Sequence, residues 1–160
     1  MEIKFEDFLQ YFPEVQLPIT IREETFQEFS STIPPLPIAM IEHFLMGEND
    51  EDDGMTEYIS CFRLPDTTEY KAIVYWKAGL LTYEYILQTY TNDGKGIIDS
   101  RVIAGTVVNG AEIIQSVARI DPDKMIYTAS GMVEAEDDFA EASNNSISIV
   151  EIFENGAIGL

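Results

Sequence analysis

The chain has 160 residues, of which 46% are hydrophobic and 11% aromatic, a composition typical of a folded domain and unlike that of a disordered acidic tail. It carries 29 acidic residues against 9 lysines and arginines, so its formal net charge is −20. This charge repels phosphate backbones and anionic lipid headgroups, which argues against direct binding to nucleic acid or to a membrane. No apolar run reaches the roughly 18 residues of a membrane span, and no secretory signal opens the sequence, so we expect a cytoplasmic protein.

The negative charge is concentrated towards the two ends of the sequence. Residues 1–60 hold 14 acidic and 2 basic residues, residues 61–124 hold 8 and 7, and residues 125–160 hold 7 and none. Clustered charge of one sign destabilises the folded state through self-repulsion, whereas solubility alone requires only charge that is evenly spread. The clustering therefore favours a role in binding. The complementary partner is a basic protein.

A short N-terminal helix is predicted before Pro13. One face of this helix gathers four apolar residues at helical spacing: Phe5, Phe8, Leu9 and Phe12. Pro13 ends the helix, because proline lacks the amide hydrogen that the next turn needs. The following segment, residues 17–21, is expected to be extended.

Two further helices are predicted before residue 47. Thr20 is a candidate N-cap for a helix over residues 21–29, whose Phe26 and Phe29 would face inward. A third helix is predicted over residues 38–46, after a proline-rich linker and before the candidate C-cap Gly47.

From residue 57 onward the hydrophobic period changes to two, which indicates strands. Asn-Gly and Asp-Gly turn signals separate them at residues 92–96 and 109–110. The seven predicted strands are residues 58–64, 69–77, 81–90, 97–104, 112–120, 124–130 and 146–153, with a further short strand as a candidate at the C-terminus.

Short turns with no helices between the strands predict an antiparallel β-meander. The expected fold is therefore α+β, with a meander of six to seven strands, as a curved sheet or a partly open barrel, and two to three N-terminal helices packed on it. We expect a single domain over residues 1–160. Its parts are a helical segment (1–47), an acidic loop (48–56) and the β-meander (57–160), which carries an acidic insert at 134–145.

The sequence offers little catalytic apparatus. His43 is the only histidine and Cys61 the only cysteine, so the common zinc sites with two or more histidine or cysteine ligands are excluded. The acidic run 49–54 partly matches a calcium loop, but Ser60 stands where that loop requires a bidentate glutamate. We therefore expect no cofactor, no metal and no enzymatic activity.

The aromatic residues of the second and third predicted strands are a second candidate feature. Side chains alternate faces along a strand, so Tyr75 and Trp76 point to opposite sides of the sheet. We expect the helices to cover only one face, so that one of these two rings is exposed and is a candidate interface anchor.

These observations favour a non-catalytic acidic protein that neutralises or regulates a basic protein partner by occlusion. The partner would be a toxin, a nuclease or another nucleic-acid-binding protein, and an immunity protein or an inhibitor is a specific form of this hypothesis. The candidate contacts are Asp50, Glu51, Asp52, Asp53, Glu136, Asp137, Asp138, Tyr75 and Trp76. The alternatives are a small-ligand-binding or carboxylate-based enzyme domain with a sheet-lined pocket, and a housekeeping domain whose acidity only keeps it soluble.

Overall fold

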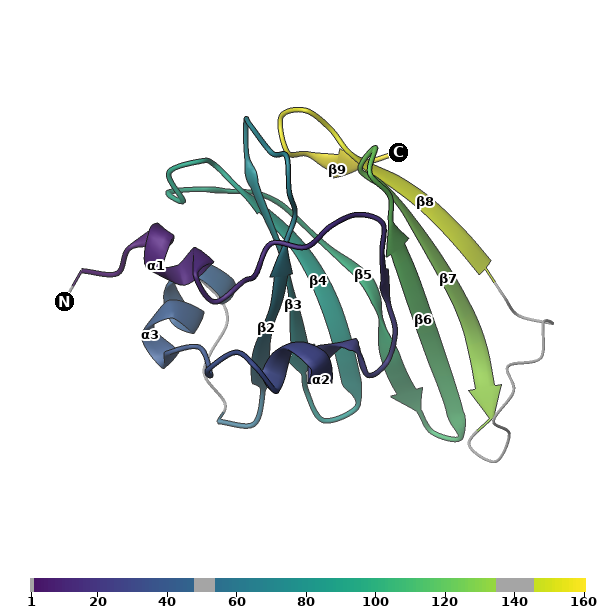
Figure 1. Ribbon diagram of the computed structural model, residues 1–160. Coiled ribbons are helices and arrows are strands. Elements are labelled where there is room, and N and C mark those ends of the chain that lie inside the picture. The colour runs from purple at the N-terminus through teal and green to yellow at the C-terminus, as the bar shows by residue number, and fades with distance from the viewer. Residues whose placement is uncertain (1, 48–53, 135–145) are drawn as a thin grey trace.

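The computed structural model describes residues 2–47, 54–134 and 146–160 as an α+β fold, with short helices followed by a large antiparallel sheet (Figure 1). The helical elements are α1 (Phe5–Leu9), α2 (Thr25–Ser30), α3 (Ile38–Met40) and a π-helical turn, η1 (Ile41–Leu45). The strands are β1 (Ile19–Ile21), β2 (Glu57–Arg63), β3 (Lys71–Ala78), β4 (Thr82–Tyr90), β5 (Ile97–Asn109), β6 (Glu112–Ile120), β7 (Met125–Glu134), β8 (Ser146–Ile152) and β9 (Ile158–Gly159).

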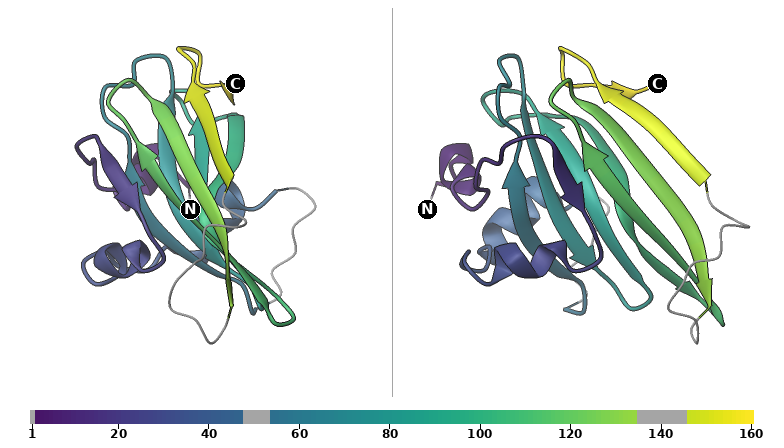
Figure 2. Two further views of the ribbon diagram at one scale, coloured as in Figure 1. Left: turned by 90° about the vertical axis from the view of Figure 1, so that its right-hand side faces the viewer. Right: turned by 45° about the vertical axis from the view of Figure 1, so that its right-hand side comes forward.

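Strands β2 to β9 follow one another across the sheet in chain order, and all neighbours are antiparallel. The predicted meander is therefore confirmed. The sheet is strongly twisted and curved, as Figure 2 shows, but in the described part of the chain its two edge strands do not pair, so it is not a closed barrel. The short strand β1 lies off this path and pairs with β6.

β5 changes partner along its length. Its first part, up to Ala104, pairs with β4 alone, Gly105–Val107 pair with both β4 and β6, and Val108 and Asn109 pair with β6. Where β5 leaves β6, β1 takes its place at the edge of β6. In the region where β5 and β6 no longer pair, the hydroxyl of Thr128, on β7, donates a hydrogen bond of 2.8 Å to the carbonyl of Ile103, on β5. The sheet thus folds towards its own concave face.

The concave face encloses the larger hydrophobic cluster, which we call the inner core. Strand residues such as Leu87 and Val74 are fully buried in it. β1 contributes Ile21, and α2 lies across its open side with Phe26 and Phe29 packed against it. Burial of this apolar surface is the main favourable term holding the two halves of the sheet together.

A second cluster, the outer core, covers the opposite face of β3 and β4. Helix α1 and turn η1 pack here against strand residues that point away from the inner core. Its buried members are Phe5, Phe8, Phe12, Leu36, Phe44, Leu45, Ile73, Tyr75, Ile86 and Tyr90.

The prediction that the helices cover only one face of the sheet is wrong. α1 and η1 cover the outer face of β3 and β4, while α2 and β1 cover the concave face, because the chain crosses from one face to the other between residues 12 and 19. All residues from Ala72 to Trp76 are buried. That continuous apolar run is typical of a strand with both faces covered.

Several predicted element boundaries also differ from the structure, and the strand predicted over residues 124–130 extends to Glu134 as β7. Thr20 lies in β1, and the second helix begins only at Thr25, whose hydroxyl accepts a hydrogen bond of 2.8 Å from the amide of Arg22. The third helix is divided into α3 and η1. β5 continues five residues beyond the predicted end at Ala104, because Gly105 adopts a φ of +152° and lets the strand bend without ending.

We expect the free energy of unfolding to fall as the pH rises above about 9. Burial raises the pKa of Cys61 above its ordinary value of 9.0, and it raises those of Tyr70, Tyr85 and Tyr90 above 10.0. The unfolded chain loses these protons at the ordinary values while the folded chain retains them. Above these ordinary pKa values the folded state binds more protons than the unfolded state. The contribution of these groups to the free energy of unfolding is therefore fully present below about pH 9 and decreases as the pH rises further.

The measurement is the urea midpoint at pH values from about 8 to about 11. The Tyr85→Phe variant is the matched control, because it removes one titrating group and should show a shallower alkaline loss. A midpoint that stays constant over this range would contradict the expectation.

Candidate partner-binding site

All seven acidic candidates, Asp50, Glu51, Asp52, Asp53, Glu136, Asp137 and Asp138, lie outside the described residues. The two undescribed internal segments, 48–53 and 135–145, contain 9 of the 29 acidic residues and no lysine or arginine. Their role in binding stays a prediction.

The described residues next to these segments lie at one end of the sheet. Glu57 opens β2 opposite Ala78, the last residue of β3, and Glu134 ends β7 opposite Glu112, the first residue of β6. The β3–β4 and β5–β6 turns therefore lie at the same end, towards the bottom of Figure 1. Both acidic segments join the sheet at this end, which we call the acidic end.

Tyr75 and Trp76 are both buried, with exposed fractions of 3% and 7%. Tyr75 belongs to the outer core and Trp76 to the inner core. The expectation that one of them is exposed is wrong, because helical segments cover both faces of β3. Tyr75 is therefore no surface anchor, whereas Trp76 lies in the wall of a pocket.

This pocket opens near the acidic end between α2 and strands β3, β4 and β5, and has a volume of about 360 Å³. We call it the aromatic pocket. Its lining residues are Glu23, Phe26, Gln27, Trp76, Tyr83, Tyr85, Gly105 and Thr106.

Three nearly parallel rings form the apolar wall of the aromatic pocket. The rings of Phe26 and Trp76 are stacked, with centroids 3.9 Å apart and planes inclined by 7°. The ring of Tyr83 continues the series 5.9 Å from that of Trp76, inclined by 12°. Tyr83 is 37% exposed. The wall therefore combines the buried ring of Trp76 and the half-buried ring of Phe26 with the accessible ring of Tyr83.

Hydrogen bonds fix the start of α2 against the strands. The hydroxyl of Tyr85 accepts from the amide of Phe26 at 2.8 Å and donates to the carbonyl of Glu23 at 3.1 Å. The side-chain amide of Gln115, on β6, donates to Oε2 of Glu23 at 2.7 Å. The exposed Glu23 carboxylate is thereby held at the rim of the aromatic pocket.

The electrostatic environment of the aromatic pocket is negative. Burial raises the pKa of Tyr85 above its ordinary value, and the negative charges of Glu24 and Glu23 contribute to the rise. The described lining residues include one carboxylate, Glu23, and no lysine or arginine. An aromatic wall beside a fixed carboxylate is suited to binding a cation.

Gly105 explains how β5 forms the floor of this pocket. A Cβ atom at this position would lie 2.2 Å from the carbonyl oxygen of Tyr83 on the neighbouring strand. Only glycine permits this close approach, which brings Tyr83 and Thr106 to the pocket from adjacent strands.

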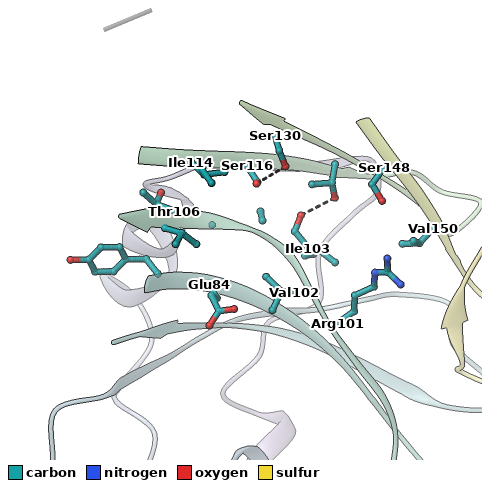
Figure 3. A pocket seen from close by; sticks show the side chains of 15 residues that line it. Glu84, Arg101, Val102, Ile103, Thr106, Ile114, Ser116, Ser130, Ser148 and Val150 are labelled. Atoms are coloured by element: carbon teal, nitrogen blue, oxygen red, sulfur yellow. Dashed lines mark hydrogen bonds between the residues drawn. The ribbon is translucent and has the colours of Figure 1, made fainter. Parts of the chain in front are cut away.

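A second cavity of about 210 Å³ is lined by residues of strands β4 to β8 (Figure 3). Hydroxyl groups dominate its polar lining, and the hydroxyls of Ser116 and Ser130 lie 2.7 Å apart within hydrogen-bonding distance. Its described charged residues are Glu84 and Arg101. Its described lining thus contains one carboxylate, whereas a carboxylate-based enzyme uses a converging pair.

The single cysteine and the single histidine of the sequence lie on opposite faces of the sheet. Cys61 is fully buried in the inner core, where burial raises the pKa of its thiol. His43 is exposed on η1, above the outer core, with its ring edge-on to Phe44 at 4.6 Å. They do not form a catalytic pair. In the part of the chain that the structure describes, no three His, Cys, Asp or Glu residues are grouped to hold a metal ion.

Comparison of the chain with protein-family models, with curated proteins and with solved structures gives no match. None of the helices in the described ranges is long and apolar enough to cross a membrane. We therefore infer function from the chemistry of the aromatic pocket and its surroundings.

Sequence reasoning missed this pocket. The sequence indicates the aromatic residues of the second and third predicted strands as a candidate feature, but it does not place Glu23 and Gln27 beside them. One feature of the sequence points to the pocket: Phe26 is an inward-facing aromatic residue on a helix whose first turn is acidic.

Proposed function

We propose that this protein is a non-catalytic acidic binding protein that neutralises or regulates a basic protein partner by occlusion. The observation that carries the proposal is the aromatic pocket with its fixed carboxylate at the acidic end of the sheet. An immunity protein or an inhibitor of a toxin or nuclease would act in this way.

Surface apolarity at the same end supports a protein partner. The β3–β4 turn exposes Leu80 by 78% and Leu81 by 53%, beside the partly exposed ring of Tyr83. Protein interfaces combine a desolvated aromatic and aliphatic centre with a charged rim. Leu80, Leu81 and Tyr83 supply such a centre, and the acidic segments that join the sheet here supply the charge.

The mechanism is charge-steered docking. Carboxylates accelerate encounter with a basic surface over about a Debye length, and contact of the apolar centre then slows dissociation. Because a basic surface that binds nucleic acid is covered in the complex, its access to phosphate is blocked without any chemical step.

The test begins with affinity capture from the native host, followed by kinetics with the purified captured protein. We expect a partner with excess lysine and arginine, whose association rate falls about tenfold or more between about 0.05 and about 0.5 M NaCl. A variant that neutralises four charges of the first acidic segment should associate about tenfold more slowly, with little change in dissociation. Its substitutions are Asp50→Asn, Glu51→Gln, Asp52→Asn and Asp53→Asn.

The matched control neutralises four exposed carboxylates in turns at the opposite end of the sheet. Its substitutions are Asp66→Asn, Glu69→Gln, Asp123→Asn and Glu154→Gln. This variant has the same net charge and should associate nearly as fast as the wild type. Equal slowing in both variants, or capture of no basic partner, would overturn the proposal.

A further inference from the structure

We infer that the aromatic pocket accepts one arginine side chain of the partner, a step that rests on the proposed function and names its central contact. The pocket has three features that suit a guanidinium group: nearly parallel rings, a fixed carboxylate and, among its described lining residues, no lysine or arginine. Its volume of about 360 Å³ is near the lower end of ligand pockets and matches a side chain better than a large cofactor.

The rings provide a surface for a planar cation. The accessible ring of Tyr83 lies nearly parallel to that of Trp76, at 5.9 Å between centroids, and Trp76 is itself stacked against Phe26. A guanidinium group stacks on such a face through cation–π attraction and through contact of two flat surfaces. The stack exists without a ligand, so little ordering is required on binding.

The carboxylate of Glu23 supplies the polar end. Gln115 is bonded to Oε2 alone, at 2.7 Å, so Oε1 keeps its capacity to accept hydrogen bonds from an incoming guanidinium. The bond to Gln115 also restricts the side chain, which is otherwise exposed and free to turn away. A guanidinium that lies on Tyr83 can direct its N–H groups towards this carboxylate.

Arginine fits this arrangement better than lysine. The ammonium group of lysine is a compact, strongly hydrated charge without a flat face, whereas the guanidinium is planar, less hydrated and has a fork of donors. The negative charges of Glu23 and Glu24 favour either cation over a neutral side chain. The geometry of the rings therefore decides between the two cations.

Trp76 makes the pocket directly observable, since it is the only tryptophan of the chain. Its indole N–H gives one cross-peak in a ¹⁵N–¹H correlation spectrum. The probes are acetylated and amidated hexa-arginine and hexalysine peptides, which carry the same charge. We expect hexa-arginine to shift this cross-peak saturably, with a dissociation constant about fivefold or more below that of hexalysine.

Two kinds of variant locate the effect. Glu23→Gln keeps the size of the side chain and an oxygen for Gln115, and should weaken hexa-arginine binding about fivefold. Tyr83→Leu keeps an apolar side chain without a ring face and should weaken it by a similar factor. Glu28→Gln, which removes an exposed carboxylate of α2 outside the pocket, is the matched control and should bind like the wild type.

Equal responses to the two peptides, no shift of the Trp76 cross-peak, or a Glu23→Gln variant that binds like Glu28→Gln would overturn the arginine pocket. Capture of a basic partner would still support the proposed function in those cases. Conversely, an arginine-specific shift without any captured basic partner would support the pocket chemistry and overturn the proposed function.

Discussion

Replacement of Phe8 by alanine is expected to lower the free energy of unfolding by about 3–5 kcal/mol, the range for removing a fully buried aromatic ring. Phe8 is 0% exposed, and its ring centroid lies 4.5 Å from that of Phe44 and 4.9 Å from that of Phe12. The substitution leaves a cavity between α1, η1 and the outer face of the sheet. Urea-induced unfolding followed by far-UV circular dichroism measures the loss.

Gln10→Ala is the control for this prediction, because Gln10 is exposed at the end of α1 and its loss should change stability by less than about 0.5 kcal/mol. Trp76 reports separately on the inner core, which lies on the other face of the sheet. We expect its fluorescence in the folded Phe8→Ala variant to stay native. A loss below about 1 kcal/mol would show that α1 contributes little to the outer core.

The strands could be predicted from the sequence because their signals are local. Alternation with period two or a short apolar run indicates most strands of the meander, and several of them end at glycine-containing turns. Gly94 and Gly110 adopt φ values of +73° and +64°, the left-handed conformation expected of residues in hairpin turns. These features depend on neighbouring residues alone, so no knowledge of the three-dimensional path is needed.

The path of the N-terminal segment could not be predicted in the same way. Its apolar residues show that it must pack, but they do not show which face of the sheet each piece covers. The run from Ala72 to Trp76 indicates that β3 is covered on both sides, since no alternation is left in it. The sequence predicts Thr20 as a helix cap, whereas in the structure its segment pairs with the edge of β6.

The aromatic pocket depends on contacts between residues far apart in the sequence. The hydroxyl of Tyr85 bonds to the backbone of Glu23 and Phe26, about sixty positions earlier. Gln115 reaches Glu23 from still further along the chain. Propensity and periodicity carry no information on such pairs. Sequence therefore indicates the aromatic and acidic components, whereas the fold determines that they meet.

Replacement of Gly105 by alanine is expected to lower the free energy of unfolding by about 2–6 kcal/mol, the sum of backbone strain and overpacking. Gly105 has a φ of +152°, and an added Cβ would lie 2.2 Å from the carbonyl oxygen of Tyr83 and 3.0 Å from Cα of Glu84. Both atoms belong to the backbone of β4, so no side-chain rotation can relieve the collision. The strands must move apart where they form the floor of the aromatic pocket.

Gly110→Ala separates the collision from the backbone strain. Gly110 has a φ of +64° but nothing within 4 Å of an added Cβ, so its substitution should cost only about 1–2 kcal/mol. Urea denaturation compares the two variants, and equal losses would contradict a role for the close approach of β5 and β4. Because displacement of β4 also moves Tyr83, the folded Gly105→Ala variant should bind hexa-arginine more weakly than Gly110→Ala does. Stability and cation binding would then depend on the same glycine.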